Sequence, residues 1–123
     1  MRLSTRVHGL MDYGLGIALV VGAATLPDGL AGTPGMVLAV TGVIGIVNAL
    51  LTDFEVGVIR KIPIPMHLWL DGVMGLAVAV SPWLLNFDQD VWLPHVLVGA
   101  LIIVAAFLTN TVPGFDRRRT SAH

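Results

Sequence analysis

Residues 65–85 read PMHLWLDGVMGLAVAVSPWLL, and Asp71 is the single Asp, Glu, Lys or Arg in this stretch. As an α-helix rising about 1.5 Å per residue, it would cross a hydrocarbon core of roughly 30 Å. Three other apolar stretches occupy residues 7–26, 36–52 and 93–111. The sequence therefore predicts an all-α membrane protein with four transmembrane helices.

The composition supports this fold class and leaves little room for a soluble domain. Of the 123 residues, 55% are hydrophobic and 12% are charged, and the mean hydropathy is +0.84, whereas soluble domains carry about 25% charged residues. The chain has no cysteine, which excludes disulfides, thiolate nucleophiles and cysteine-ligated metals. Because the connections between the apolar stretches are short, we expect residues 1–123 to form one membrane domain.

The basic residues are distributed unevenly and predict the orientation. They lie before the first apolar stretch, between the second and third, and in the C-terminal tail: Arg2, Arg6, Arg60, Lys61, Arg117, Arg118 and Arg119. Loops 27–33 and 86–90 contain neither Lys nor Arg. The positive-inside rule then places both termini in the cytoplasm. Five aromatic residues near the predicted boundaries are expected to be interfacial anchors: Tyr13, Phe54, Trp69, Trp83 and Trp92.

The chain contains an internal repeat. A shift of 59 residues aligns residues of the first and third stretches, and a shift of 57 aligns those of the second and fourth. The aligned pairs include His8 with His67, Asp12 with Asp71, Gly16 with Gly75, Gly42 with Gly99, and Thr52 with Thr109. We therefore predict a tandem repeat of two-helix units, about 5–55 and 64–112, followed by a basic tail at 113–123. An even number of spans per unit keeps both copies parallel, so a pseudo-two-fold axis should lie along the membrane normal.

The run from Ser81 to Phe87, SPWLLNF, resembles the signature of the SPW-repeat membrane proteins. The runs LTDFE at 51–55 and HLWLD at 67–71 are also similar to that family, and the resemblance extends over essentially the whole chain. It implies two spans per repeat, with Ser81, Pro82 and Trp83 in the first span, and a bacterial or archaeal cytoplasmic membrane. The first repeat departs from the motif, with Gly22-Ala23-Ala24 at that place. The resemblance implies a fold and leaves the activity open.

Two matching polar stripes are the most informative feature for function. His8, Asp12 and Gly16 are spaced by four residues, as are their repeat equivalents from His67 to Gly75. Residues four apart lie on one face of a helix. An ionisable group facing lipid costs several kcal/mol, and small residues mark close helix packing. Both stripes should therefore face the bundle interior and lie across the pseudo-two-fold axis from each other.

The ends of the second and fourth stretches add polar residues on the same side of the membrane. These are Asn48, Thr52, Asp53, Thr109 and Asn110. Asp53 near a helix C-terminus faces an unfavourable dipole, so Arg60 is expected to be its partner. Together with the two stripes, these residues predict one polar cluster near the cytoplasmic face.

Several interpretations of this cluster remain open. In one interpretation, it only fastens the two halves together, without cofactor or catalysis. In another, it binds or relays a divalent cation or proton through His8, Asp12, His67 and Asp71. Alternatively, His8 and His67 are the axial ligands of a b-type haem. A third alternative is an enzyme acting on a lipid or quinone-like substrate through an Asp/His pair. Apart from the bilayer, homo-oligomerisation is a possible association, and no nucleic-acid partner is expected.

The sequence also predicts three local features. Pro82 should bend its helix, with Ser81 bonding the backbone carbonyl that proline leaves free. His95, which has no repeat partner, is expected to be solvated at the interface. Gly14, Ala18 and Gly22 form a ridge of small residues that should pack inside the bundle or mediate a dimer.

Overall fold

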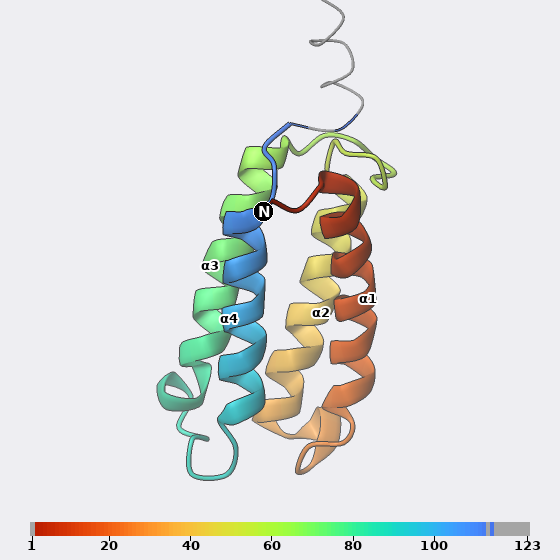
Figure 1. Cartoon of the computed structure of the whole chain (residues 1–123). Helices are drawn as coiled ribbons and strands as arrows, with labels where there is room; N and C mark the ends of the chain where they lie inside the picture. Colours follow the sequence, from red (N-terminus) through yellow and green to blue (C-terminus); the bar gives the residue numbers. More distant parts are fainter. Residues whose placement is uncertain (1, 113, 115–123) are drawn as a thin grey trace, which may run out of the picture.

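The structure is a computed structural model that describes residues 2–112 and 114. In this part of the chain, four α-helices form an elongated bundle (Figure 1). They are α1 (Thr5–Ala23), α2 (Thr33–Leu51), α3 (Ile64–Leu84) and α4 (Leu93–Leu108), with a short 3₁₀ helix, η1 (Gly29–Ala31), before α2. The all-helical architecture is as predicted, and each helix lies within a few residues of its predicted stretch. The arginines of the basic tail lie outside the described residues.

The helix ends have recognisable causes. The Ser4 side chain caps α1 by accepting from the backbone N–H of Val7 at 3.1 Å, as N-cap residues do. Proline stands in the first turn of α2, α3 and α4, where its missing N–H costs nothing. Beyond α3, Asn86 has a φ of 59°, a left-handed conformation that ends the helix. These residues account for the starts of all four helices and for the end of α3.

The helices pack as two pairs, α1 with α2 and α3 with α4, and α2 also packs against α3. Glycine allows the closest approach in each pair. A Cβ on Gly16 would lie 2.8 Å from the carbonyl oxygen of Gly42, and a Cβ on Gly75 would lie 2.8 Å from that of Gly99. The two contacts are equivalent, because the shift of 59 aligns Gly16 with Gly75 and the shift of 57 aligns Gly42 with Gly99. The same small residues thus set the same backbone contact in both pairs.

One end of the bundle carries a second equivalent pair of contacts. Leu3, just before α1, pairs with the end of α4: its N–H donates to Leu108 at 2.7 Å, and its carbonyl accepts from Asn110 at 3.0 Å. Ile62, just before α3, pairs in the same way with Leu51 and Asp53 at the end of α2, at 2.8 Å in both bonds. Each segment that leads into one helix pair is therefore bonded to the other pair.

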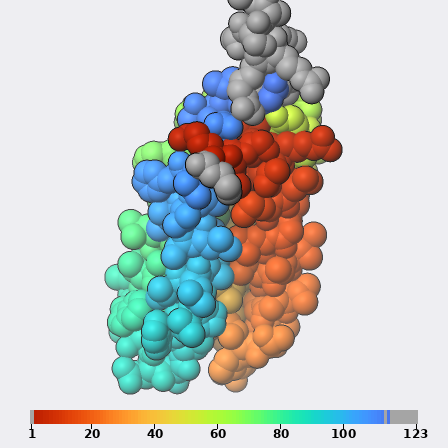
Figure 2. Space-filling model, viewed as in Figure 1, coloured from red at the N-terminus to blue at the C-terminus, as the bar shows by residue number. Residues whose placement is uncertain are grey.

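The outer surface of the bundle is largely apolar. Leucine, isoleucine, valine, methionine and aromatic side chains are exposed along all four helices, with Trp69 at 67% and Phe107 at 79% exposure. By length and apolar composition, α2 and α3 are each able to cross a membrane, whereas α4 is apolar but has 16 residues. A seam between α4 and α1 runs down the front of the molecule, with α2 behind it (Figure 2).

Two local expectations have clear outcomes. The Ser81 hydroxyl donates to the carbonyl oxygen of Val78 at 2.7 Å, the carbonyl that Pro82 cannot bond, so the predicted role of Ser81 is confirmed. The expectation for His95 is wrong. Its side chain is fully buried, and its Nε2 lies 2.9 Å from the Pro34 carbonyl, to which it donates. Its ring also packs on Phe87, with centroids 4.8 Å apart.

Candidate functional site

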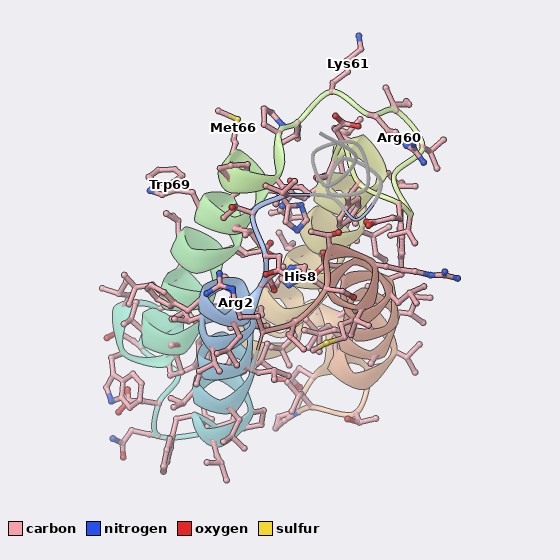
Figure 3. The ribbon with its side chains drawn as sticks, turned by 45° about the horizontal axis from the view of Figure 1, so that its top comes forward. Arg2, His8, Arg60, Lys61, Met66 and Trp69 are labelled. Carbon is pink, nitrogen blue, oxygen red and sulfur yellow. The ribbon has the colours of Figure 1, made fainter. Side chains whose placement is uncertain are left out.

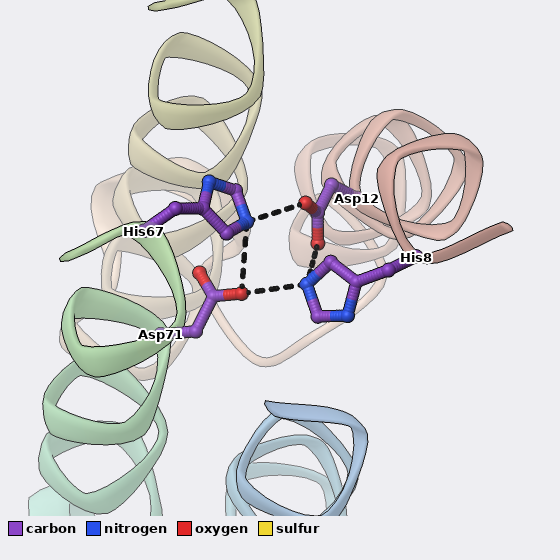
Figure 4. Close-up of side chains that lie close together, drawn as sticks. All are labelled: His8, Asp12, His67 and Asp71. Atoms are coloured by element: carbon purple, nitrogen blue, oxygen red, sulfur yellow. Dashed lines mark hydrogen bonds and ion pairs between the residues drawn. The ribbon is translucent and has the colours of Figure 1, made fainter. Parts of the chain in front are cut away.

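The two polar stripes meet inside the bundle. His8 and Asp12 project from α1 toward His67 and Asp71 on α3, and the four side chains form a closed ring of contacts (Figure 4). One ligand atom from each residue lies within 4.8 Å of the others. We call these four residues the His/Asp cluster. In Figure 3, His8 lies within the bundle, whereas Trp69 and Met66 project outward from α3.

The shortest contacts of the His/Asp cluster cross between the two halves of the chain. His8 Nε2 lies 2.8 Å from Asp71 Oδ2, and His67 Nε2 lies 2.9 Å from Asp12 Oδ2. The contacts within each helix are longer, at 3.3 Å for His8 with Asp12 and 3.2 Å for His67 with Asp71. The four distances therefore show the same pattern in both halves of the chain.

Thr52 determines which nitrogen of His67 carries a proton. Its hydroxyl lies 2.6 Å from the backbone carbonyl of Asn48 and 2.7 Å from His67 Nδ1. A carbonyl only accepts, so the single hydroxyl proton is used in the bond to Asn48. The Thr52 oxygen must then accept from His67, whose Nδ1 carries hydrogen. The Nε2 atom is left facing the two carboxylates, with either a lone pair or a second proton.

Thr109 fixes His8 in the same way. Its hydroxyl donates to the carbonyl of Ala105 at 2.6 Å and accepts from His8 Nδ1 at 2.7 Å. Thr52 and Thr109 are the residues that follow α2 and α4, and both have extended backbone, with ψ of 141°. Each helix end thus positions a hydroxyl behind an imidazole, and both Nε2 atoms point into the cluster. Metal-binding histidines have this arrangement, with the outer N–H held by a hydrogen-bond acceptor.

Two atoms inside the His/Asp cluster lack a hydrogen bond. His67 Nε2 and Asp12 Oδ2 are 2.9 Å apart but are not aligned for hydrogen bonding, and both are buried without a hydrogen-bond partner among the described residues. The side chain of His67 is only 1% exposed. Buried polar atoms without a partner are uncommon and costly. They mark the centre of the cluster as a place where a proton or a cation would be stabilised.

The surroundings of the two carboxylates differ in one residue. Asn48 donates from its amide to Asp71 Oδ1 at 3.3 Å and to the carbonyl of His67 at 3.4 Å. The shift of 57 aligns Asn48 with Ala105, which has no polar side chain to offer Asp12. The Asp12 side chain is accordingly 15% exposed, against 4% for Asp71. The site is therefore more open on the side of Asp12.

The loop at residues 52–62 covers the end of the site. Phe54 is 1% exposed, and its ring centroid lies 5.4 Å from that of His67. Gly9 makes room for this loop, because a Cβ there would lie 2.8 Å from the Phe54 ring. Tyr13 donates to the carbonyl of Val56 at 2.8 Å, and Thr5 donates to Glu55. The cluster is thus closed toward this end of the bundle.

A small cavity of about 20 Å³ adjoins the carboxylates on the other side. Asp12, Asp71, Thr41 and Gly45 are among the residues that line it. This volume accommodates about one water molecule. A single water there would have carboxylate oxygens and the Thr41 hydroxyl as neighbours.

Three residues of the predicted polar cluster, Asp53, Asn110 and Arg60, lie outside the four-residue His/Asp cluster. Among the described residues, the group of His and carboxylate side chains that could share an ion is the His/Asp cluster alone, without Asp53. The backbone becomes extended at Thr52 and Thr109, so Asp53 and Asn110 leave the helical register. Asn110 accepts from Arg2 at 3.1 Å. Arg60 is exposed and donates to the backbone carbonyls of Glu55 and Gly57.

The packing argues against the haem alternative. The rings of His8 and His67 are edge to face, with centroids 5.3 Å apart. The carboxylates of Asp12 and Asp71 contact both Nε2 atoms at 2.8–3.3 Å. A porphyrin between two axial imidazoles would need that space, which the carboxylates occupy.

Two residues that shape the site were not predicted from the sequence. Phe54 was predicted to be an interfacial anchor, and the structure corrects this, since its ring is buried over His67. The chain reversal after α2, which places Phe54 there, leaves no periodic signal. Ala105 was not predicted to matter. The shift of 57 aligns it with Asn48, and this difference indicates that the two carboxylates have unequal surroundings.

Comparison with known proteins supports the family resemblance and adds no activity. Neither the curated proteins nor the solved structures gave a significant match. A family model described as the SPW repeat domain matches residues 6–109, which covers all four helices and every residue of the His/Asp cluster. The chain belongs to the SPW repeat family.

Proposed function

We propose that the protein is a multi-pass membrane protein built as a tandem, parallel repeat of two-helix units, with the His/Asp cluster near its cytoplasmic face. Support comes from the family, the apolar outer surface and the equivalent contacts at Gly16–Gly42 and Gly75–Gly99. The N-terminus and the loop with Arg60 and Lys61 lie at the same end of the bundle (Figures 1 and 3). That end faces the cytoplasm under the positive-inside rule.

We propose further that the His/Asp cluster binds a divalent first-row transition-metal ion, such as Zn²⁺, through two imidazoles and two carboxylates. The observation that carries this proposal is the orientation of the two imidazoles, because Thr52 and Thr109 hold both Nδ1–H groups outward and leave both Nε2 atoms inward. Mixed nitrogen and oxygen ligands suit zinc and its neighbours, and four ligands are usual for bound zinc. The orphaned Nε2 of His67 supplies the second support.

The metal-free and metal-bound states of the cluster would carry the same net charge. Without metal, two imidazolium ions would neutralise the two carboxylates, and the site would carry no net charge. With a divalent ion and two neutral imidazoles, the net charge is again zero. A buried site with unbalanced charge would be costly, and neither state has this cost. Binding should therefore release about two protons per metal ion.

Calorimetric titration of the purified, metal-free protein with Zn²⁺ tests this function. We expect one ion per chain, and titrations in two buffers of different ionisation enthalpy should show release of about two protons. Asp12→Asn should weaken binding strongly, whereas Asp53→Asn, outside the cluster, should not change it. Co²⁺ should give the absorption spectrum of a four-coordinate ion. Binding that Asp12→Asn leaves intact, or that releases no protons, would show that the cluster is not the metal site.

A further inference from the structure

A groove between α1 and α4 leads to the open side of the His/Asp cluster. Its volume is about 370 Å³, within the range of small-molecule sites. The cluster residues His8, Asp12 and Asp71 contribute to its lining. The rest of the wall is apolar and includes Met11, Gly14, Ala18, Leu101 and Ala105. The groove follows the seam between the two helices in Figure 2.

Two departures from the internal repeat open this groove. Ala105 stands where the other half has Asn48, whose amide covers Asp71 by a hydrogen bond at 3.3 Å. Gly14 stands where the other half has Val73, and a Cβ on Gly14 would have no described atom within 4 Å. Because Ala105 and Gly14 are smaller than their counterparts, a space remains between α1 and α4, and no amide covers the Asp12 carboxylate. The ridge of small residues at Gly14 and Ala18 therefore lines a groove instead of a tight helix contact.

The position of the groove limits what can enter it. Phe54 and its loop cover the cluster from the cytoplasmic end of the proposed orientation. The groove opens sideways, between helices whose outer surface is apolar, so in a membrane its mouth faces lipid. A molecule that reaches Asp12 by this route must be soluble in the bilayer. The volume suits one ring with a short chain and is too small for a whole phospholipid.

The polar atoms at the base of the groove select the head group. Asp12 lines the groove, and its side chain is 15% exposed. A carboxylate oxygen accepts only, so a head group that bonds to it must donate. The groove is otherwise apolar, so a charged head group would lose its hydration there at a high cost. A neutral hydroxyl group satisfies both requirements.

We propose that this groove binds a neutral, lipid-soluble molecule with a hydroxyl on an aromatic ring, of the phenol or quinol class, which donates a hydrogen bond to Asp12. The binding site rests on the membrane placement proposed above and does not require the metal. The ring lies along Gly14 and Ala18, and the chain extends toward the lipid. Asp12 is the residue that recognises the head group.

Methionine-methyl NMR of the full-length protein in phosphatidylcholine nanodiscs tests this proposal, with 4-hexylphenol as the probe and hexylbenzene as its matched control. Met11 lines the groove, whereas Met36 lines a different hollow between α2 and α3. We expect 4-hexylphenol to shift the Met11 signal saturably and to leave the Met36 signal unchanged. Hexylbenzene should shift neither. Equal shifts with hexylbenzene, or shifts at both methionines, would mean nonspecific partitioning and would overturn the proposal.

A repeat-guided variant sharpens the test. Ala105→Asn places in the groove the side chain that the other half carries at Asn48, and it should weaken 4-hexylphenol binding about 10-fold or more, since a lost hydrogen bond to a charged group has about this effect. Ala77→Asn, in the hollow between α2 and α3, should leave the affinity unchanged. An unchanged affinity in Ala105→Asn would overturn the proposal. Because the titration is run without metal, failure of the Zn²⁺ experiment leaves this result intact, and the reverse also holds.

Discussion

His8 Nε2 lies 2.8 Å from Asp71 Oδ2 on α3, closer than the 3.3 Å that separates it from Asp12 Oδ1 on its own helix. His67 shows the same preference for the opposite half, with 2.9 Å to Asp12 and 3.2 Å to Asp71. The closest ion pairs thus join α1 to α3. Neither half of the chain contains a complete site, since each contributes one imidazole and one carboxylate.

Reporter fusions test the proposed orientation. Fusions within residues 54–62 and after His123 should report a cytoplasmic location, because the basic residues of the chain flank those positions. Fusions within 27–33 and 86–90 should report the external side. An external reporter after His123 would contradict both the orientation and the even number of spans.

The threonines behind the imidazoles should control metal affinity. Thr52→Val and Thr109→Val preserve shape but remove the oxygen that accepts from Nδ1–H, at 2.7 Å in both cases. Loss of such an outer hydrogen bond typically costs 10–100-fold in metal affinity, and calorimetric titration with Zn²⁺ would measure it.

Thr25→Val is the matched control for these variants. The Thr25 hydroxyl also donates to a backbone carbonyl, that of Gly22 at 2.6 Å, but it lies beyond the far end of α1 and bonds to neither imidazole. Its Zn²⁺ affinity should therefore stay close to that of the unmodified protein. Equal losses in all three variants would point to a general loosening of the bundle and not to a fixed imidazole tautomer.

The pH dependence of metal binding should be steep. In the protonated cluster, each Nε2 carries a proton that a metal ion must displace. Zn²⁺ affinity should therefore fall as the pH is lowered, by about 100-fold per pH unit where both imidazoles are protonated, since two protons compete with one ion. Titrations across the acidic range would measure this slope. A slope of about 10-fold would indicate that only one imidazole exchanges its proton for the metal.

The periodicity of the sequence was sufficient to predict the helices and the meeting of the stripes. His8 with Asp12 and His67 with Asp71 lie four residues apart, and ionisable groups in an apolar helix must face inward. Their partners across the bundle follow from the repeat. The limit of this reasoning appears at Asp53 and Asn110, because spacing cannot show where a helix ends. The backbone is extended at Thr52 and Thr109. Asp53 and Asn110 therefore do not continue the helix face on which they were predicted to lie.

Other features depend on packing that no local pattern encodes. The burial of His95 requires the carbonyl of Pro34 and the ring of Phe87, which come from two separate segments. Similarly, hydrogen-bond directions at Thr52 become clear only when the Asn48 carbonyl and the His67 ring are both in place. The sequence suggests polar residues for a site, and the structure is needed to assign their protons.

The coupling between the two carboxylates can be measured directly. Asp12→Asn and Asp71→Asn each remove one of the two carboxylates that contact the buried imidazoles, so each should lower the free energy of unfolding by about 1–3 kcal/mol. Since both carboxylates contact the same two imidazoles, the second substitution removes contacts that the first has already weakened. The double variant should therefore cost less than the sum, by about 0.5–3 kcal/mol. Unfolding in detergent with a chelator present measures the protein without metal.

A distant pair provides the control for this coupling. Asp88 lies in the loop after α3, at the opposite end of the bundle from the cluster, and its side chain accepts from Gln89 at 3.0 Å. Asp12→Asn and Asp88→Asn share no partner, so their effects on the free energy of unfolding should add within about 0.5 kcal/mol. Additive effects for Asp12 and Asp71 as well would mean that the imidazoles do not join the two halves in solution. The cross-helix distances of 2.8 and 2.9 Å make non-additivity the expected result.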